Sequence, residues 1–277
     1  MKAADLQYAA CAEPAEAVGR LAAAEGMAKV CAGTQSLGPM MNLRLAQPAL
    51  LLDVSRMPAL ARAGLRDGRF VTGAALTHAR VEDGEGAAPS RGLLPQVAAG
   101  IAYRAVRNRG TLGGSLAHAD PAADWVSTAC LLDAGIHVLG PRGARRVAAT
   151  DFFLAAFTTA LADDELIVEI DWPVLSPQAR WAYRKQCRKP GEFAEAMVAI
   201  WTDPAQAIAR LVIGALDGAP AVVSGAAEVA ALRERAGQTA LFDAIGLTDP
   251  YRRQLQSVML ARAFAQLDAR PGPETTP

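Results

Sequence analysis

The sequence from 107 to 124, RNRGTLGGSLAHADPAAD, constrains this chain more than any other stretch. It contains Gly110, Gly113 and Gly114, and such a glycine cluster permits positive φ angles and a close approach of the backbone to a bulky group. The Asp-Pro pair at 120–121 then favours the start of a helix, because Asp can cap and Pro suits the first helical position. The pattern predicts a loop, a tight glycine turn, a short segment and a capped helix. The alternative is a glycine-rich turn between two core helices.

A second stretch of similar character lies nearer the N-terminus, where residues 30–36 read VCAGTQS. It includes the end of a short apolar run at 27–31 that predicts a buried strand. Turns of this kind present successive backbone N–H groups, which form concave anion sites. Two donor-rich turns suit a ligand with two phosphates. Neither is a Walker loop or a G-x-G-x-x-G fingerprint, because the Gly-Lys-Ser/Thr ending and the glycine spacing are missing.

Taken together, the motifs resemble the FAD-binding medium subunit of molybdenum hydroxylases, in the carbon monoxide dehydrogenase and xanthine dehydrogenase family. The family's A-G-G-x-S-L segment stands here as AGTQSLGPMMNLRL at 32–45, and its R-N-x-G-T-x-G-G segment begins at Arg107. Two further segments, VTGAALTH at 71–78 and YRKQCRKPGEFA at 183–194, also resemble family motifs. Thr34 replaces the family's second glycine. Since a β-branched residue resists positive φ, either φ is negative at this position or the turn is altered.

The resemblance implies an α+β fold: a two-part FAD-binding domain of the PCMH/vanillyl-alcohol-oxidase type, followed by a C-terminal domain with a small antiparallel sheet and helices. A proline-rich segment, PVLSP, marks the best domain boundary. The expected divisions are an N-terminal α/β FAD-binding subdomain at 1–56, a second FAD-binding subdomain at 57–173 and the C-terminal domain of the medium subunit at 174–277.

The residues from 166 to 172 alternate between apolar and mixed positions, which predicts a half-buried strand. We expect one face to carry Leu166, Val168, Ile170 and Trp172. The opposite face would then carry Ile167, Glu169 and Asp171. Further on, the Asp-Pro pair at 249–250 predicts the capped start of the final helix.

Composition limits the partners and the metal chemistry open to this chain. The 277 residues carry 28 basic and 28 acidic side chains, and this balance argues against nucleic acid or an anionic membrane as the main partner. No apolar run approaches the ~18 residues that span a bilayer, and the first residues lack an apolar signal-peptide core, so a cytoplasmic protein is expected. The four cysteines form no C-x-x-C pair and the three histidines lie far apart, so no metal site is predicted.

The predicted FAD contacts fall mainly in the two glycine turns. Their backbone N–H groups and hydroxyls are expected to hold the pyrophosphate, with an ordinary turn as the alternative for each glycine. The residues expected to contact the cofactor there are Ala32, Gly33, Thr34, Gln35, Ser36, Leu37, Thr111, Gly113, Gly114 and Ser115. FAD brings its own redox chemistry, so no nucleophile–base pair is required, and we identify no catalytic residue in the sequence.

The resemblance implies further contacts outside the turns, and each has a structural alternative. It places Asp124 beside the ribityl or ribose hydroxyls, whereas a first-turn acid also suits the helix dipole. It places Ile167 against the isoalloxazine ring, whereas ordinary sheet packing would also bury this residue. Arg184 or Lys185 is expected to bring positive charge to the flavin pyrimidine ring, or else to be a solvated charge on an edge strand. His118 is expected near the flavin or a phosphate, or in a structural role.

Three functions fit these features. In the first, implied by the resemblance, electrons leave a molybdenum cofactor on a large subunit, pass through iron–sulfur clusters on a small subunit, and reach FAD on this chain, which reduces an external acceptor. The assembly would be a dimer of heterotrimers. In the second, the chain is a stand-alone FAD-dependent oxidoreductase, which would need an acid–base pair over the flavin. In the third, it is a non-catalytic scaffold. The intact segment 111–124 argues against a scaffold, whereas Thr34 keeps that reading open.

Overall fold

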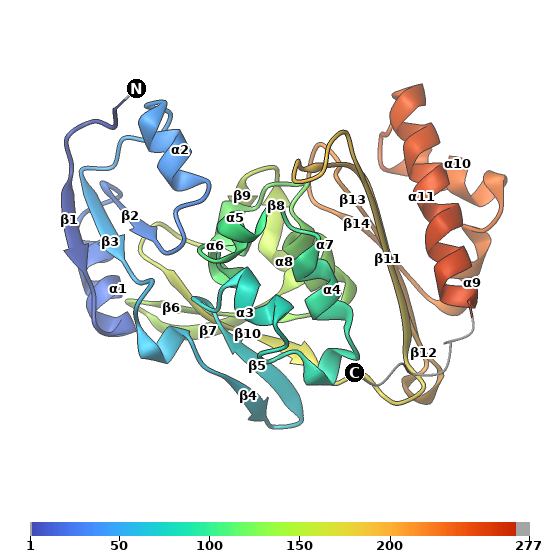
Figure 1. Cartoon of the computed structure of the whole chain (residues 1–277), viewed down its shortest axis with the longest axis horizontal. Helices are drawn as coiled ribbons and strands as arrows, with labels where there is room; N and C mark the ends of the chain where they lie inside the picture. The colour runs from blue at the N-terminus through green and yellow to red at the C-terminus, as the bar shows by residue number, and fades with distance from the viewer. Residues whose placement is uncertain (1, 270–277) are drawn as a thin grey trace.

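The computed structural model describes residues 2–269, which form three units side by side (Figure 1). The N-terminal unit, blue in Figure 1, is built on a three-stranded parallel sheet in the order β1-β3-β2. Its elements are β1 (Gln7–Ala10), α1 (Pro14–Ala23), β2 (Ala28–Cys31), α2 (Leu37–Asn42) and β3 (Leu50–Asp53). Helix α1 begins with a proline and buries Ala17, Val18 and Leu21, the one-sided spacing of an amphipathic helix. Strand β2 ends at Cys31, directly before the first glycine turn.

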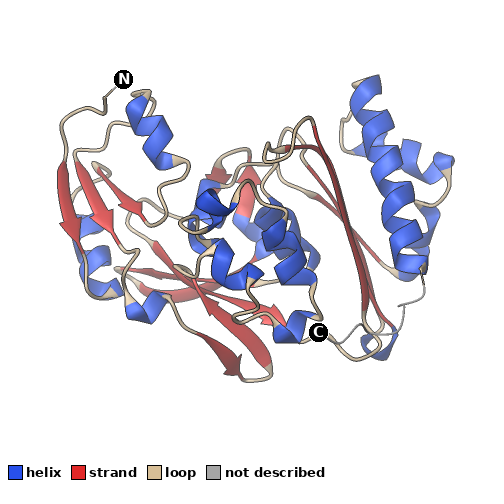
Figure 2. Ribbon diagram, in the orientation of Figure 1, coloured by secondary structure: helices blue, strands red, loops and turns tan. Residues whose placement is uncertain are grey.

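The central unit is a five-stranded antiparallel sheet in the order β4-β5-β10-β6-β7, with helices packed over one face (Figure 2). Its strands are β4 (Ala63–Arg66), β5 (Arg69–Gly73), β6 (Gly135–Gly140), β7 (Gly143–Ala148) and β10 (Leu166–Pro173), with a small hairpin of β8 (Phe153–Ala155) and β9 (Thr158–Thr159). Its helical elements are η1 (Pro58–Leu60), α3 (His78–Glu82), η2 (Ala88–Ser90), α4 (Leu93–Ala99), α5 (Arg104–Arg107), α6 (Leu112–His118), α7 (Asp124–Leu131) and α8 (Ala149–Phe152). All eight residues of α7 are buried, so this helix lies inside the molecule and not on one of its faces.

The C-terminal unit is a four-stranded antiparallel meander covered on its outer face by helices (Figure 2). Its elements are β11 (Arg180–Cys187), β12 (Ala194–Asp203), η3 (Pro204–Gln206), β13 (Ile208–Gly214), β14 (Ala221–Ser224), α9 (Ala226–Ala231), α10 (Arg235–Ala244) and α11 (Pro250–Asp268). Asp249 caps α11 by accepting hydrogen bonds from the backbone N–H groups of Tyr251 and Arg252, as the sequence predicts. None of the helices in residues 2–269 combines the length and apolar character needed to cross a bilayer.

These elements confirm the predicted α+β architecture. The predicted boundaries at 56 and 173 fall in the connection after β3 and at the last residue of β10. The core of the central unit continues into the inner face of the C-terminal sheet, where Tyr183, Met197 and Trp201 belong to the same hydrophobic cluster as Trp125. The ranges 1–56, 57–173 and 174–277 stay a proposed division, in which the last two share one core.

The predicted alternation in β10 is wrong beyond its first residues. The pairing of β10 with β6 shifts register between Ile167 and Glu169, which marks a β-bulge at Val168. A bulge places an extra residue on one strand and changes which side chains share a face. Ile167 therefore belongs to the same core as Ile170, whereas Leu166 packs in the core of the N-terminal unit. The bulge places Ile170 and Trp172 in the same core as Ile167, whereas strict alternation would have put them with Leu166.

Candidate functional site

A cavity of about 1080 Å³ lies where the three units meet. It is lined by the turn after β2, by α6 and the residues that follow it, by the segment from β9 to β10, and by the loop between β11 and β12. The volume is at the upper end of the roughly 300–1,000 Å³ that is typical of small-molecule sites. The cavity therefore has room for a large, extended ligand.

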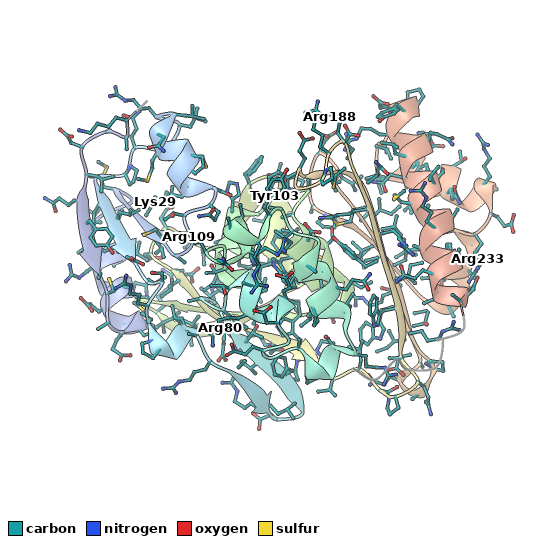
Figure 3. The ribbon with its side chains drawn as sticks, in the orientation of Figure 1. Lys29, Arg80, Tyr103, Arg109, Arg188 and Arg233 are labelled. Carbon is teal, nitrogen blue, oxygen red and sulfur yellow. The ribbon has the colours of Figure 1, made fainter. Side chains whose placement is uncertain are left out.

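The two glycine turns are in backbone contact beside this cavity. A Cβ added at Gly33 would overlap the carbonyl oxygen of Arg109, and a Cβ added at Gly110 would lie 2.7 Å from Nε2 of His78. Figure 3 shows Arg109 between the N-terminal unit and the central helices, at this contact. Gly113 is similarly close to Ala74. At Gly33, Gly110 and Gly113 a side chain would collide with other parts of the protein, so glycine is required there. Gly114 is exposed and lines the cavity, although a Cβ added there would lie 2.8 Å from the Thr111 hydroxyl.

The first turn has the donors of an anion site. None of the five backbone N–H groups at 33–37 donates to an acceptor within residues 2–269, and all five residues line the cavity. Thr34 has φ of 56°, in the left-handed region, so the negative φ considered for this β-branched residue is wrong. The side chains of Thr34 and Gln35 both donate to the carbonyl oxygen of Gly33, each at 2.8 Å. Such a turn forms a concave nest of N–H groups that suits a phosphate.

The second turn differs from the prediction, because four of its backbone donors already have acceptors. The N–H groups of Leu112 and Gly113 donate to carbonyl oxygens at 76 and 74, and those of Gly114 and Ser115 donate to Thr111. Thr111 is the N-cap of α6, so its hydroxyl satisfies the helix it precedes. The turn leaves for a ligand the backbone N–H of Thr111, which has no acceptor within residues 2–269, the hydroxyl of Ser115 and the surface of Gly114.

The predicted helix start at 120–121 is also wrong. Helix α7 begins at Asp124, and the carboxylate of Asp120 instead accepts from the backbone N–H of Ala122 at 2.9 Å, in a turn before the helix. The local signal was correct for an Asp-initiated turn. The burial of α7 shifts the helix start to Asp124.

Asp124 joins the central and C-terminal units. It is 6 % exposed, and its Oδ1 accepts hydrogen bonds from the Tyr183 hydroxyl and the Lys185 ammonium group, both at 2.6 Å. Burial, followed by the charge of Asp124, raises the pKa of Tyr183 well above its usual value, so Tyr183 stays a neutral donor. Asp124 lines the cavity, and both hydrogen bonds fall on one carboxylate oxygen. Its Oδ2 therefore keeps its capacity to accept from a ligand hydroxyl.

The structure distinguishes between the two predicted cations. Tyr183 and Lys185 lie on the face of β11 that meets Asp124, whereas Arg184 is exposed on the opposite face. Lys185 also donates to the carbonyl oxygen of Gly100 at 2.8 Å, which fixes its position behind Asp124. Neither cation lines the cavity, so Lys185 acts on it through Asp124 and Arg184 is not brought to the site.

The other predicted residues reach the cavity. Ala32, His118 and Ile167 all line it. The ring of His118 packs on Phe157, with 5.2 Å between the ring centroids. Within residues 2–269, no group of three or more His, Cys, Asp or Glu side chains is arranged to hold a metal ion.

Sequence reasoning missed His78 as a site residue. Its backbone N–H donates to the carbonyl oxygen of Gly110, and its Nδ1 accepts from the indole N–H of Trp125 at 3.0 Å. Burial, with a smaller effect of Arg107, lowers the pKa of His78 to about 4. The ring is therefore neutral at pH 7 with its proton on Nε2, which faces Gly110 and the cavity. The segment VTGAALTH, which resembles a family motif, was the available signal.

The fold and the cavity define an α+β protein that binds an extended ligand carrying a pyrophosphate. Residues 4–175 match the family described as the FAD binding domain in molybdopterin dehydrogenase, and the chain belongs to this family. The predicted family and the predicted FAD cofactor are thereby confirmed. The chain is an FAD-binding medium subunit of the molybdenum hydroxylase type.

Individual relatives agree with this assignment. The chain is 39% identical over 199 residues to the carbon monoxide dehydrogenase medium chain of Hydrogenophaga pseudoflava, covering 70% of this chain and 68% of that one. It is 36% identical over 167 residues to the 6-hydroxypseudooxynicotine dehydrogenase complex subunit alpha of Paenarthrobacter nicotinovorans, covering 60% of this chain and 56% of the relative. The solved carbon monoxide dehydrogenase from Hydrogenophaga pseudoflava that lacks the Mo-pyranopterin moiety superposes with a TM-score of 0.86 and 32% identity, covering 96% of this chain and 98% of that one.

The left-handed conformation of Thr34 predicts a reversed order of stability for substitutions at this position. At a negative φ, Ala is more stabilising than Gly by about 0.4–1 kcal/mol, but a side chain at a left-handed position costs roughly 1–2 kcal/mol. We expect Thr34→Gly to be more stable than Thr34→Ala by roughly 1 kcal/mol in urea unfolding of the cofactor-free chain. At Gly19, which lies inside helix α1 and where an added Cβ meets nothing within 4 Å, the Gly19→Ala variant should instead be more stable than the wild-type glycine. The same order at both positions would contradict the left-handed turn.

The buried neutral His78 predicts a loss of stability in acid. Its pKa is about 4 in the folded chain and about 6.5 when unfolded, so its contribution is complete above pH 6.5 and decreases as the pH falls toward 4. His78→Asn keeps an acceptor for Trp125 but does not titrate. In urea unfolding from pH 7.5 to 4, the wild type should lose up to about 3 kcal/mol of unfolding free energy relative to the variant. A constant difference across this range would show that His78 is not buried and neutral.

Proposed function

We propose that this chain is the electron-transfer subunit of a molybdenum-containing hydroxylase or dehydrogenase. FAD held in the cavity would receive electrons from iron–sulfur clusters on a small partner subunit, which are supplied by a molybdenum cofactor on a large one. An external acceptor would then take them. The observation that carries the proposal is the nest of five N–H groups at 33–37, which opens into a cavity shared by all three units.

The residues present fit FAD. The N–H groups at 33–37 would bind the pyrophosphate, with the Ser115 hydroxyl as a further donor. Oδ2 of Asp124 would accept from a ribityl or ribose hydroxyl, while Lys185 holds the other carboxylate oxygen in place. Ile167 offers an apolar surface to a flat ring. The bound flavin supplies electron transfer in one- or two-electron steps, and the chain supplies binding and orientation.

The titratable groups of the cavity favour electron transfer over substrate oxidation on this chain. Asp124 is bonded to Tyr183 and Lys185, and Glu165 is paired with Arg145. His78 has its Nδ1 committed to Trp125. These three groups are thus each held by a protein partner, which counts against them as the acid–base pair that a stand-alone oxidoreductase would need.

The proposed partners are a large molybdenum-cofactor subunit and a small iron–sulfur subunit, assembled as a dimer of heterotrimers. The relatives support a multi-subunit assembly, because their names describe a medium chain and a subunit of a dehydrogenase complex. The cytoplasmic location expected from the sequence stays a prediction.

Gly114→Val tests the proposed cofactor site. Gly114 is the exposed glycine of the second turn and lines the cavity, so the added side chain would crowd a ligand there. Its Cβ would also lie 2.8 Å from the Thr111 hydroxyl that caps α6, so a melt of the apo protein must accompany the titration. We expect apo protein carrying Gly114→Val to lose FAD affinity by at least a hundredfold in a fluorescence titration, with its secondary structure retained by circular dichroism. Gly19→Val is the matched control, because Gly19 is also helical and an added Cβ there meets nothing within 4 Å. Equal affinity of the two variants would remove the second turn from the site.

Anaerobic reduction of the flavin tests the electron-transfer role. The isolated chain loaded with FAD should keep its flavin oxidised when mixed with N-heterocycles, aldehydes or carbon monoxide, since it has no site to oxidise them. The same chain purified with its partner subunits should be bleached rapidly by the substrate of the complex. Rapid bleaching of the isolated chain, with molybdenum and iron absent by elemental analysis, would favour the stand-alone oxidoreductase.

A further inference from the structure

Two residues with unusual backbone conformations line the cavity. Within residues 2–269, eleven residues other than glycine have positive φ, and one of them is β-branched and one is aromatic. These two are Thr34 and Phe157, and both line the cavity. Positive φ is an outlier for bulky side chains, and such outliers gather at functional sites because the surrounding structure must maintain them. Thr34 is explained by the nest, whereas Phe157 has no role so far.

Phe157 is held at the cavity edge by its backbone and not by burial. It lies in the turn between β8 and β9, with φ of 55°, and its N–H donates to the carbonyl oxygen of Ala119 at 3.0 Å. The residue is 59% exposed, so packing does not account for the aromatic ring. The ring of His118 lies against it at 5.2 Å, tilted by 53°. The hairpin therefore presents an open aromatic face to the cavity.

This face lies within reach of a ring of the proposed cofactor. Helix α6 has seven residues and rises about 1.5 Å per residue, so His118 at its end is about 10 Å from the contact of the two glycine turns. FAD carries a flat heteroaromatic ring on each side of its pyrophosphate, joined through a pentose or a ribityl chain. A pyrophosphate held at 33–37 would bring one of these rings to the end of α6. Exposed aromatic side chains stack readily on such rings.

We infer that Phe157, backed by His118, forms a stacking subsite for one flat ring of FAD. The inference rests on the proposed function, because it requires that the cavity holds FAD. It makes Phe157 a binding residue, and it makes His118 a positioning residue that fixes the plane of the Phe157 ring. It also gives a reason for an exposed aromatic residue with strained backbone.

The test compares FAD dissociation constants of apo proteins by fluorescence titration. Phe157→Leu keeps an apolar side chain and loses the ring, so it should weaken FAD binding about tenfold, the scale of one aromatic–ring stack. Phe157→Tyr keeps the ring and should bind within about twofold of wild type. Leu154→Ala is the matched control, because Leu154 is 60% exposed on the same hairpin but does not line the cavity. It should bind as the wild type does.

A second variant separates binding from structure. Asn tolerates the left-handed region, so Phe157→Asn should raise the melting temperature of the apo protein while it weakens FAD binding. A residue with only a structural role would not move these two quantities in opposite directions. Titrations with FMN and with ADP then locate the ring: a defect with FMN identifies the isoalloxazine, and a defect with ADP identifies the adenine.

The outcomes distinguish the inference from the proposed function. If wild type binds FAD and Phe157→Leu binds FAD, FMN and ADP with unchanged affinity, the stacking subsite does not exist and the proposed function stands. If wild type fails to take up FAD, the proposed function fails first. A tenfold loss in Phe157→Leu that Phe157→Tyr restores supports the subsite.

Discussion

The backbone contact between Gly33 and the Arg109–Gly110 peptide is the constraint on which the rest of this site depends. An added Cβ at Gly33 would overlap the Arg109 carbonyl, so the two turns can meet beside the cavity only with glycine at this position. The contact joins the end of a parallel strand in the N-terminal unit to the turn before α6 in the central unit. Behind Gly110, His78 is held by Trp125, which belongs to the buried helix α7. A chain of direct contacts thus runs from the N-terminal sheet to the centre of the molecule.

Helix α7 extends this connection to the C-terminal unit. Asp124 at its first turn is buried, and a buried carboxylate without partners would be strongly destabilising, so Tyr183 and Lys185 must stay in place on β11. The loop that follows β11 is fixed by Tyr103, whose hydroxyl donates to the carbonyl oxygen of Pro190 at 2.8 Å. Figure 3 shows Tyr103 where the central helices approach this loop. One wall of the cavity therefore depends on the C-terminal unit, and this unit is part of the cofactor site as well as a covering domain.

Much of the site could be predicted because its motifs are local, and the errors arise where long-range contacts decide. The first turn, the strand before it and the cap at Asp249 follow from short sequence patterns. The choice of Lys185 over Arg184 depends on which face of β11 meets α7, and the sequence does not specify that face. The bulge at Val168 depends on the register with β6, which local alternation cannot reveal. The contribution of Phe157 depends on a hairpin whose position is set by a hydrogen bond to the end of α6.

The two glycine turns look alike in sequence, yet they differ in what they can give to a ligand. An N–H group that already has an acceptor has little to offer a phosphate, so the paired groups at 112–115 serve the protein, whereas the unpaired groups at 33–37 are the donors that the proposed site would use. The strain at Thr34 falls in this first turn. Such strain costs about 1–3 kcal/mol, whereas each hydrogen bond to a charged group contributes about 1.5–3 kcal/mol. Two such bonds to a pyrophosphate therefore offset the strain, and replacement of the family's glycine by threonine is compatible with FAD binding.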